Sequence, residues 1–384
     1  LLSVTLQISN FLELRVNDTF AYLKRRYVEE YDEFLHGYLK TDVDMYRDRT
    51  IVNIFGQGLK FAYVVYMLSV SIVKRHSLGT FKALYDYVDM TYTSVYNIFD
   101  SMSYISALLG YDEKFFELMN YEGFGDHEHG TQKLKKGTPQ VEFKNLSFSY
   151  PDDPETMVLK HIDLVVNPGE KVAFFGGDGS GKSTMVKILS GLYQIKKGDY
   201  LLDNISVKDL DRGQLKKKVA VTFQDFINYN FSVKENVVIS GERKNINKDL
   251  YETVSKVSLV KDFLGKEKID DEKILGKTFP GGKELPLGYW QRLAIARMLY
   301  RDRKIFVMDE SFTFIDSESK DTILHNILDF IGTDRTLIYI TRSIENLDMF
   351  DKIYFFENGK IIESGNWREL MKKRKKFYKI VKEI

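Results

Sequence analysis

The segment GGDGSGKS, residues 176–183, matches the pattern GxxxxGK[ST]. A short apolar run, Lys171 to Phe175 (KVAFF), precedes it, and apolar residues at helical spacing follow it. In this order, glycines let backbone N–H groups surround phosphate oxygens at the start of a helix. The sequence therefore predicts a strand, a phosphate-binding loop and a helix within an α/β domain.

Each residue type in the loop suits a nucleotide with Mg²⁺. The Lys182 ammonium is expected to reach the β- and γ-phosphates, and the Ser183 hydroxyl is expected to ligate the metal ion. The residues predicted to bind the nucleotide here are Gly176, Gly177, Asp178, Gly179, Ser180, Gly181, Lys182, Ser183 and Thr184.

A second apolar run, Lys304 to Met308 (KIFVM), ends in the acidic pair Asp309-Glu310. An acidic pair is weak evidence by itself, but its position after a phosphate loop makes it informative. We expect Asp309 to hold Mg²⁺ through water and Glu310 to polarise the attacking water as a general base. Asp309 therefore joins Ser183 in the predicted metal site.

The composition excludes several classes of protein. Of 384 residues, 43% are hydrophobic and 29% are charged, which is typical of globular domains, and the net charge of +1 gives no electrostatic case for nucleic acid. The absence of cysteine excludes disulfides and thiolate metal sites. The chain begins at Leu1 without a basic region or cleavage site, so we expect no signal peptide and a missing N-terminal part.

The chain changes character along its length. Residues 1–49 are charged and helical in pattern. Ile51 to Val73 carries one charge, Lys60, and as a helix of about 34 Å it would cross a bilayer, although a buried core helix fits the same pattern. The glycine-rich stretch 123–138 is predicted to be a linker, and strand-like and helical runs alternate from residue 139 onward.

Thr80 to Leu109 has two faces at helical spacing. One face is nearly apolar, and another carries Asp86, Asp89 and Asp100. Such a helix would line a water-filled path between membrane helices, because a carboxylate is costly in lipid. Periodicity alone slightly favours an ordinary amphipathic helix or coiled-coil arm in water.

Further motifs follow in the order of a known family, and with them the sequence resembles the ABC transporters, specifically exporters whose membrane and ATP-binding domains share one chain. The additional motifs are Tyr150 in FSYP, Gln224 in VTFQDF, WQRLAIAR at 290–297, TFID at 313–316 and IYFFENGKIIESG at 353–365. The resemblance implies that Tyr150 stacks on adenine and that Gln224 touches Mg²⁺ and senses the membrane domain. The implied cofactors are ATP and Mg²⁺.

The resemblance also implies the fold class and the domains. Residues 1–122 would be the C-terminal part of an α-helical membrane domain, with two transmembrane helices plus cytoplasmic helices. Residues 123–138 would be the linker, and 139–384 an α/β P-loop NTPase domain of ABC type. The segment from Ser77 resembles the start of the sixth membrane helix, so Ile51 to Val73 would be the fifth. A coupling helix would lie within residues 10–25, and roughly four earlier helices would be absent from this chain.

The same resemblance also implies a cellular location and binding partners. The chain would be an ATP-hydrolysing half-transporter in the cell membrane, multi-pass, with its ATP-binding domain in the cytoplasm. It would contact membrane lipid and a second half-transporter, as a homodimer or a heterodimer, and no nucleic acid. The aspartate stripe of residues 86, 89 and 100 would face the transport path, which suggests a polar or cationic cargo.

The signature segment departs from the family pattern. The usual LSGGQ, which completes the ATP site of the opposite subunit, reads Leu285-Pro286-Leu287-Gly288-Tyr289 here. Pro286 offers neither a hydroxyl nor an N–H, and Leu287 adds bulk where a phosphate should approach closely. We expect Pro286, Leu287 and Gly288 to form a weakened contact with the nucleotide.

A second departure follows the predicted strand 336–340. The family pattern I-T-H-R reads ITRS at residues 340–343, so Arg342 replaces a histidine, and none of the six histidines in the chain takes that place. An arginine binds phosphate but cannot accept a hydrogen bond from the attacking water. We predict Glu310, Gln224 and Arg342 as the catalytic residues, with slow or asymmetric turnover; a neutral substitution is the alternative.

Three functions stay open from the sequence. The leading one is ATP-driven export. A soluble ABC-type ATPase acting on nucleic acid or translation is disfavoured by the apolar segment 51–73 and by the single phosphate loop. An ATP-binding regulatory subunit with little turnover, or the degenerate half of a heterodimeric exporter, is suggested by Pro286, Leu287 and Arg342.

Overall fold

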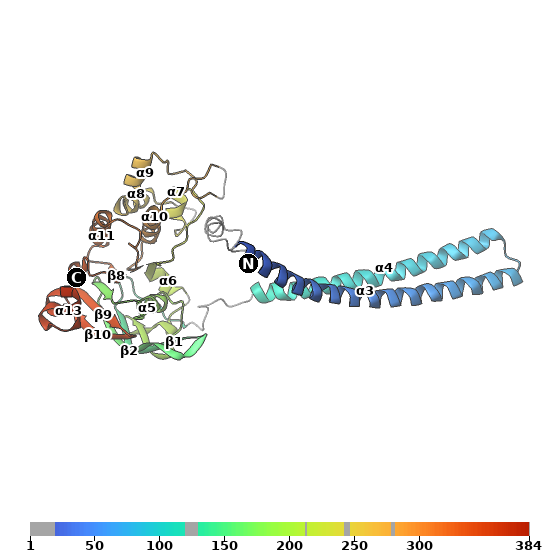
Figure 1. Ribbon diagram of the computed structural model, residues 1–384, viewed down its shortest axis with the longest axis horizontal. Helices are drawn as coiled ribbons and strands as arrows, with labels where there is room; N and C mark the ends of the chain where they lie inside the picture. Colours follow the sequence, from blue (N-terminus) through green and yellow to red (C-terminus); the bar gives the residue numbers. More distant parts are fainter. Residues whose placement is uncertain (1–19, 120–129, 212, 242–245, 278–280, 384) are drawn as a thin grey trace. The chain divides into compact units, whose positions relative to one another are not determined.

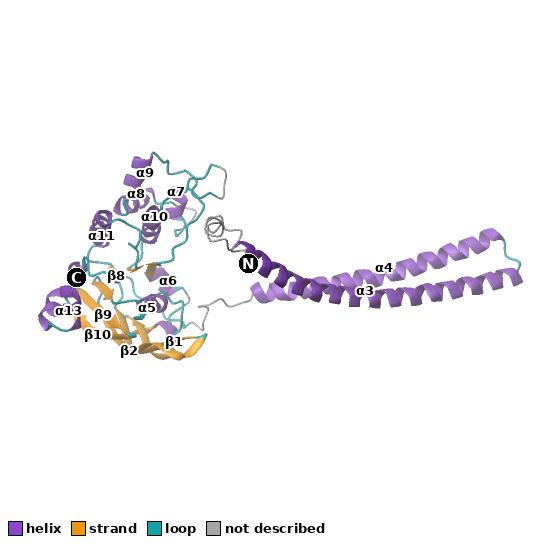
Figure 2. Cartoon of the chain, viewed as in Figure 1, coloured by secondary structure: helices purple, strands orange, loops and turns teal. Residues whose placement is uncertain are grey.

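The computed structural model describes residues 20–119, 130–211, 213–241, 246–277 and 281–383. The chain forms two compact units, which divide between residues 121 and 122 (Figure 1). In the described residues the first unit is helical, and the strands lie in the second (Figure 2). The domain bounds 1–122, 123–138 and 139–384 stay a prediction, and part of the expected linker lies outside the described residues.

Two long helices, α3 (Phe20–Val73) and α4 (Leu78–Met119), form the described part of the first unit. A turn reverses the chain between them, so that they form a helical hairpin (Figure 1). Within the described residues, one segment, Asn53–Val73, is long and apolar enough to cross a membrane. This measure agrees with the first predicted membrane helix and does not find the second. Residues 10–19 of the predicted coupling helix lie outside the described part of the chain.

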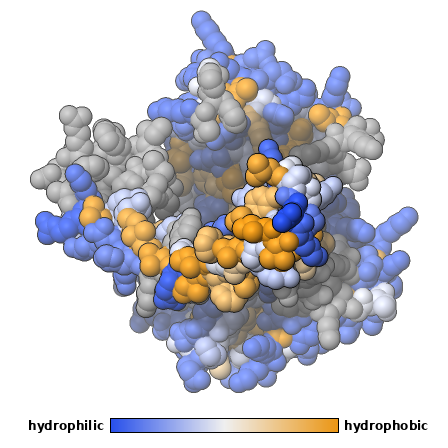
Figure 3. All heavy atoms as spheres, turned by 90° about the vertical axis from the view of Figure 1, so that its right-hand side faces the viewer, coloured by the Kyte–Doolittle hydropathy of each residue, from blue (hydrophilic) through white to orange (hydrophobic). Residues whose placement is uncertain are grey.

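The hairpin of α3 and α4 leaves large apolar side chains uncovered. Phe61 and Ile72 are each 72% exposed, and hydrophobic residues gather along the hairpin in the space-filling view of Figure 3. An apolar surface of this kind is unfavourable in water and favourable against lipid or further helices. The hairpin is therefore expected to be covered by one or the other.

An ion pair joins the two helices. The Lys60 ammonium of α3 pairs with the Asp89 carboxylate of α4, and the ring centroids of Tyr85 and Tyr92 lie 5.9 and 5.6 Å from the Lys60 nitrogen. Asp89 thus has a cationic partner within the chain. The aspartate stripe expected from the sequence is therefore not a row of uncompensated charges.

The second unit contains two sheets. The larger has the strand order β10-β9-β3-β8-β7-β6, parallel from β9 to β6, with β10 antiparallel at its edge. The smaller has the order β2-β1-β4-β5 and is antiparallel. The strands are β1 (Val141–Tyr150), β2 (Asp153–Val166), β3 (Lys171–Phe175), β4 (Lys197–Leu202), β5 (Ile205–Ser206), β6 (Val219–Thr222), β7 (Ile305–Asp309), β8 (Thr336–Thr341), β9 (Lys352–Glu357) and β10 (Lys360–Gly365).

Helices and short 3-10 turns connect these strands. They are α5 (Lys182–Leu189), η1 (Val207–Asp209), α6 (Gln214–Lys218), α7 (Val233–Val238), α8 (Lys248–Val257), α9 (Val260–Glu267), α10 (Leu287–Tyr300), α11 (Ser317–Ile331), η2 (Leu347–Met349), α12 (Trp367–Lys373) and α13 (Lys376–Glu383). Between β6 and β7, α10 packs against α7, α8 and α9. This helical group carries the signature segment at the start of α10.

The strands predicted around the candidate site are confirmed. β3 spans Lys171–Phe175 as expected, and β7 begins and ends one residue later than expected, at Ile305 and Asp309. Every residue of β7 is buried, which explains its uninterrupted apolar sequence, because inner parallel strands are covered on both faces. The predicted closing hairpin at 353–365 corresponds to β9 and β10.

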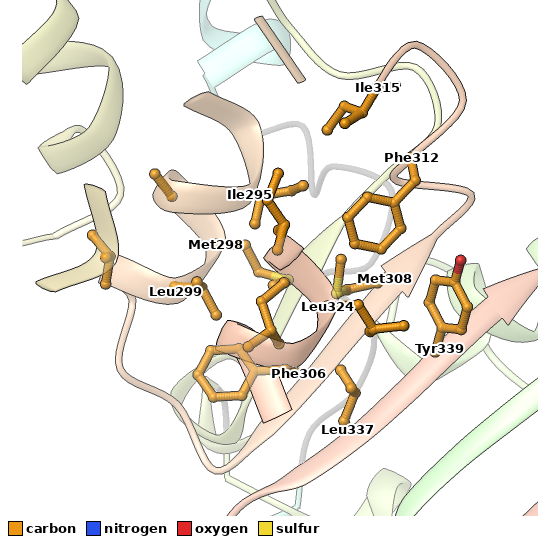
Figure 4. Packing of buried hydrophobic residues seen from close by; sticks show 14 of the residues in the cluster. Ile295, Met298, Leu299, Phe306, Met308, Phe312, Ile315, Leu324, Leu337 and Tyr339 are labelled. Atoms are coloured by element: carbon orange, nitrogen blue, oxygen red, sulfur yellow. The ribbon is translucent and has the colours of Figure 1, made fainter. Parts of the chain in front are cut away.

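A hydrophobic core fixes the chain just beyond the end of β7. Figure 4 shows side chains from α10, β7, β8 and α11 meeting the loop after β7: Ile295, Met298, Leu299, Phe306, Met308, Leu324, Leu337 and Tyr339. Two loop residues, Phe312 and Ile315, belong to the same cluster and are 6% and 9% exposed. Glu310 lies between these anchors and β7, so the core sets the position of its main chain.

Candidate functional site

The sheet register brings three strand ends together. Parallel pairing sets Phe175 of β3 opposite Thr341 of β8, and Asp309 of β7 opposite Ile340 of β8. The segments after these strands carry the phosphate loop, Glu310 and Arg342. Because the carboxyl ends of parallel strands meet at one edge of the sheet, motifs far apart in sequence become neighbours there.

The phosphate loop depends on glycine at close approaches. A Cβ on Gly176 would lie 2.2 Å from the Phe356 carbonyl oxygen, and a Cβ on Gly181 would lie 2.6 Å from a methyl carbon of Leu159. Gly181 also has a φ of 99° and caps the N-terminus of α5. Only glycine meets both demands without strain. The loop therefore leads directly into the helix start that attracts phosphate.

Lys182 lies at the centre of this loop. Its Nζ donates hydrogen bonds to the carbonyl oxygens of Gly176 and Gly177, each at 2.7 Å, and to the Ser180 hydroxyl at 3.0 Å. The side chain is buried, and burial lowers the pKa of the Lys182 ammonium, while the charge of Glu310 raises it. This position is consistent with the predicted phosphate-binding role of Lys182, since its buried ammonium lies within the loop that is expected to surround the phosphates.

The two residues predicted to hold the metal ion meet. The Ser183 hydroxyl donates to Oδ1 of Asp309 at 3.3 Å, although the two residues are 126 positions apart. Asp309 is 3% exposed, and burial raises the pKa of its carboxyl to about 6. A hydroxyl and a carboxylate are hard oxygen donors that suit Mg²⁺, and the cation would favour the ionised carboxylate. The residues present therefore fit the metal.

Gln224, the third predicted metal contact, is placed differently. It lies two residues beyond the end of β6, and its side chain is exposed. In the described structure, the side-chain hydrogen bonds of Ser183 and Asp309 do not include it. Its predicted role at the metal stays a prediction.

Glu310 and Arg342 form an ion pair. Arg342 Nη2 lies 2.6 Å from Glu310 Oε2, and the Glu310 side chain is only 10% exposed. The main chain of Glu310 has a φ of 45°, in the left-handed region that is strained for a residue with a side chain. A cavity of about 190 Å³ lies beside both residues, with room for water next to the carboxylate. The predicted general base is thus positioned and accessible, but it is held by the arginine that replaces the expected histidine.

The same guanidinium reaches the phosphate loop, which sequence reasoning missed. Arg342 Nη1 donates to both carboxylate oxygens of Asp178, at 2.8 and 3.1 Å. The signal was present, because an acidic residue inside a phosphate-binding loop is electrostatically unfavourable unless a cation lies nearby. Arg342 therefore bridges two carboxylates, one in the loop and one at the end of β7.

Tyr150 lies beside the helix that follows the loop. Its hydroxyl is 2.9 Å from the Thr184 hydroxyl, and the Lys187 ammonium lies 5.3 Å from its ring centroid. Phe148 and Tyr193 pack edge-to-face against the ring, each with a centroid separation of 5.3 Å. A groove of about 300 Å³ borders this aromatic cluster. The structure thus brings together Tyr150 and Thr184, both of which were predicted to bind the nucleotide.

The signature segment packs against the loop after β7. Pro286 caps the N-terminus of α10, and Leu287 is 49% exposed. A Cβ on Gly288 would lie 2.5 Å from the Phe314 carbonyl oxygen, and the Phe314 N–H donates to Gln291 Oε1 at 2.9 Å. Gly288 is therefore required by its close approach to residue 314, and an exposed leucine stands at the start of the helix.

Arg297 links α10 to the loop that carries Gln224, and sequence reasoning did not identify it. Its Nε and Nη2 donate to the carbonyl oxygen and side-chain oxygen of Asn236 at 2.8 and 2.9 Å, and its Nη1 donates to the Ile227 carbonyl at 3.1 Å. The guanidinium lies 4.6 Å from the Tyr229 ring centroid. Burial lowers the pKa of Arg297 to about 10, so it remains charged at neutral pH. An arginine within the apolar run WQRLAIAR was the available signal.

Residues 159–313 match the family described as ABC transporter. The chain is similar to the subtilin transport ATP-binding protein SpaT of Bacillus subtilis, with 28% identity over 94% of this chain and 59% of that protein. It is also similar to the ATP-dependent lipid A-core flippase of Pectobacterium atrosepticum, with 27% identity over 82% of this chain and 53% of that protein. The chain thus spans between half and two thirds of the length of these relatives.

A solved structure described as a bacterial Atm1-family ABC exporter with ATP bound has the same fold. The TM-score is 0.78, with 20% sequence identity, and the match covers 98% of this chain and 64% of that chain. At this identity the likeness concerns the fold. The predicted fold class, a helical region followed by an α/β domain with a phosphate loop, is confirmed.

Proposed function

Because the chain belongs to the ABC transporter family, we propose that it binds ATP with Mg²⁺ at the phosphate loop and hydrolyses it to drive export across a membrane. The observation that carries this proposal is the meeting of Ser183 with Asp309 at 3.3 Å beside the loop that holds Lys182. A cation-binding pair next to a buried ammonium is the arrangement that a nucleotide triphosphate requires.

In the proposed binding step, the loop N–H groups and Lys182 meet the phosphates. Ser183 and Asp309 would hold a Mg²⁺ ion, which would supply positive charge to offset that of the phosphates. Tyr150 offers an aromatic face near the start of α5, which suits the adenine. The groove of about 300 Å³ along this tyrosine leaves space for a base.

In the proposed hydrolysis step, Glu310 accepts the proton of the attacking water. Its carboxylate is nearly buried and lies at the cavity beside Arg342, so water bound there would meet it. The ion pair with Arg342 at 2.6 Å occupies the carboxylate oxygen that would otherwise be free to accept that proton. We therefore expect turnover to be slow compared with a chain that has histidine at this position.

The proposed export rests on the helical hairpin. α3 and α4 expose apolar side chains such as Phe61, which suits contact with membrane lipid and with further helices. The cargo is unidentified. A polar or cationic cargo remains the hypothesis drawn from Asp86, Asp89 and Asp100, with the least weight on Asp89 because Lys60 already neutralises it.

A second half-transporter is the proposed partner. Leu287 at the start of α10 and Phe314 in the loop after β7 are 49% and 48% exposed, so both apolar side chains lie at the protein surface and are available for contact with a partner. In the family pattern the signature segment, which includes Leu287, completes the ATP site of the opposite subunit. We place the chain in the cell membrane with its nucleotide site in the cytoplasm.

A regulatory subunit that binds ATP with little turnover is the second candidate. The specific observation in its favour is the Arg342–Glu310 pair, which occupies the carboxylate that hydrolysis needs. The proline at residue 286 adds to this, since it cannot donate a hydrogen bond to a phosphate. A degenerate half of a heterodimeric exporter would share both features.

Two variants of the full chain, purified in detergent, test the proposal. Lys182→Ala should lose most of its affinity for Mg²⁺-ATP, measured by calorimetry, and equal affinity in wild type and variant would refute the site. Arg342→His should raise ATP turnover if the arginine restrains Glu310. Tight ATP binding without turnover in both wild type and Arg342→His would favour the regulatory subunit.

A further inference from the structure

Three charged side chains form a continuous bridge across the nucleotide site. We call Asp178, Arg342 and Glu310 the clasp. Arg342 Nη1 is bonded to both oxygens of Asp178 at 2.8 and 3.1 Å, and Nη2 lies 2.6 Å from Glu310. The guanidinium is a planar fork, so its two arms cannot move independently. Any movement of Arg342 toward one ligand therefore disturbs both carboxylates.

Asp178 has no packing role that would explain it. Its side chain is 80% exposed, whereas Glu310 is 10% exposed. It stands within the loop whose N–H groups meet phosphate, so its charge opposes the ligand that the loop attracts. Its described hydrogen-bond partner among side chains is Arg342, 164 residues away. The structural consequence of Asp178 is thus the position of Arg342.

Nucleotides with and without a γ-phosphate would meet the clasp differently. A γ-phosphate near Lys182 and Glu310 would be the natural new ligand of the Arg342 fork, since guanidinium binds phosphate oxygens as well as carboxylates. To reach it, Nη1 leaves Asp178. A diphosphate presents no group at that place, so the bond between Asp178 and Arg342 persists.

Resting on the nucleotide site proposed above, we propose that Asp178 is a positioning residue that holds Arg342 away from the γ-phosphate and so weakens the preference of the site for ATP over ADP. Binding of a triphosphate breaks the Asp178–Arg342 bond and withdraws the guanidinium from Glu310. Binding of a diphosphate leaves the clasp closed. The clasp therefore couples recognition of the γ-phosphate to release of the carboxylate that activates water.

Charge repulsion alone would give a superficially similar result. A carboxylate near the loop repels a triphosphate more than a diphosphate, whatever Arg342 does. The two explanations separate in a variant without the guanidinium. If Asp178 acts through Arg342, its substitution has no selective effect there; if it acts by repulsion, the selective effect persists.

The experiment is a double-mutant cycle on the full chain in detergent. Calorimetry gives the dissociation constants of Mg²⁺-ADP and of the non-hydrolysable β,γ-imido analogue of ATP for wild type, Asp178→Asn, Arg342→Gln and the double variant. Asp178→Glu tests rescue, because it keeps the charge on a longer side chain. Asp329→Asn is the matched control, an exposed aspartate near the end of α11.

The expected result is a two- to fivefold gain in preference for the ATP analogue over ADP in Asp178→Asn, since an exposed ion pair is worth up to about 1 kcal/mol. The preference of Asp178→Glu for the ATP analogue should lie close to that of wild type, and the preference of Asp329→Asn should equal that of wild type. In the Arg342→Gln background, Asp178→Asn should change the preference by less than about 1.5-fold.

Two results overturn the inference alone, with nucleotide still bound. One is an unchanged preference in Asp178→Asn, and the other is a gain that persists without Arg342. A third result overturns the proposed function as well. In that result, the wild type has no higher affinity than Lys182→Ala for Mg²⁺-ADP or for the ATP analogue. The failures are distinguishable because only the third abolishes binding.

Discussion

Substitution of Arg297 by alanine should destabilise the ATP-binding unit and displace the loop that carries Gln224. The side chain donates three hydrogen bonds, to Asn236 O at 2.8 Å, Asn236 Oδ1 at 2.9 Å and Ile227 O at 3.1 Å. Its guanidinium also lies 4.6 Å from the Tyr229 ring centroid. Removing it leaves three acceptors without a charged donor at the junction of α7, α10 and this loop.

The magnitude follows from opposing terms. A hydrogen bond from a charged donor is worth about 1.5–3 kcal/mol, which would give a gross loss of roughly 5–9 kcal/mol for three. Burial of the guanidinium, which lowers the pKa of Arg297 to about 10, costs part of this gain in the native state. We expect a net loss of about 3 kcal/mol for Arg297→Ala. Arg297→Lys keeps a charge but not the fork, and should lose about 1–2 kcal/mol.

The assay is urea unfolding of the full chain, followed by the fluorescence of its two tryptophans, the buried Trp290 of the same helix and Trp367 of α12. With an m-value of about 3 kcal/mol/M, the midpoint for Arg297→Ala should fall by about 1 M. The control is Arg368→Ala, an exposed arginine of α12, which should change stability by less than about 0.5 kcal/mol. Equal midpoints for Arg297→Ala and Arg368→Ala would show that the three hydrogen bonds of Arg297 do not stabilise the fold.

Three further predictions concern close contacts and charges. Gly288→Ala should cost about 1–3 kcal/mol, because its Cβ would lie 2.5 Å from a main-chain oxygen of the loop after β7, whereas Gly265→Ala in α9 meets nothing within 4 Å and should be neutral or stabilising in urea unfolding. Asp309→Asn should stabilise the nucleotide-free chain at pH 8 by at most about 3 kcal/mol in denaturation with EDTA, because ionising this carboxyl costs the native state. Its folded pKa of about 6 exceeds the usual 3.8, so this advantage should shrink as pH falls from 6 to 4, and a pH-independent difference would contradict it. The charge-swapped double variant, Lys60→Asp with Asp89→Lys, should lose at most half as much thermal stability in detergent as Lys60→Ala. A loss in the double variant equal to the sum of the losses in Lys60→Asp and Asp89→Lys would disprove the pairing.

The sequence predicted the local parts of the site well. The phosphate loop, β3 and the buried strand before Asp309 are short segments whose residue types follow from their own backbone and burial. Their meeting was also predictable, because the segments that follow parallel strands lie at one edge of the sheet, and there Ser183 meets Asp309. These elements needed no information on side-chain packing.

Contacts between distant side chains were not predictable. Asp178 and Arg342 are 164 residues apart, and the sequence predicted a contact of Arg342 with phosphate rather than with Asp178. Arg297 and Asn236 are 61 residues apart, and neither carries a motif that names its partner. Such pairs depend on rotamers and on the packing of α7 against α10, which periodicity does not encode.

The helical hairpin shows a different limit. Periodicity located both helices, but the hydropathy of α4 reflects a mixture of apolar and acidic faces, and the described residues give one span, 53–73, that passes as a membrane crossing. The ion pair of Lys60 with Asp89 was also not predicted, because the two residues lie on separate helices whose packing the sequence pattern does not define. What surrounds a helix decides whether such a pair is exposed or buried, and a single sequence does not state it.

The most direct test of the central claim is ATP turnover by the full chain beside Glu310→Gln. Phosphate release is measured under saturating Mg²⁺-ATP, and ATP binding is measured on the same samples. We expect Glu310→Gln to bind ATP at least as well as wild type but to release phosphate about 10²–10⁴-fold more slowly. Phosphate release by Glu310→Gln at the wild-type rate would contradict the assignment of Glu310 as the base that activates water.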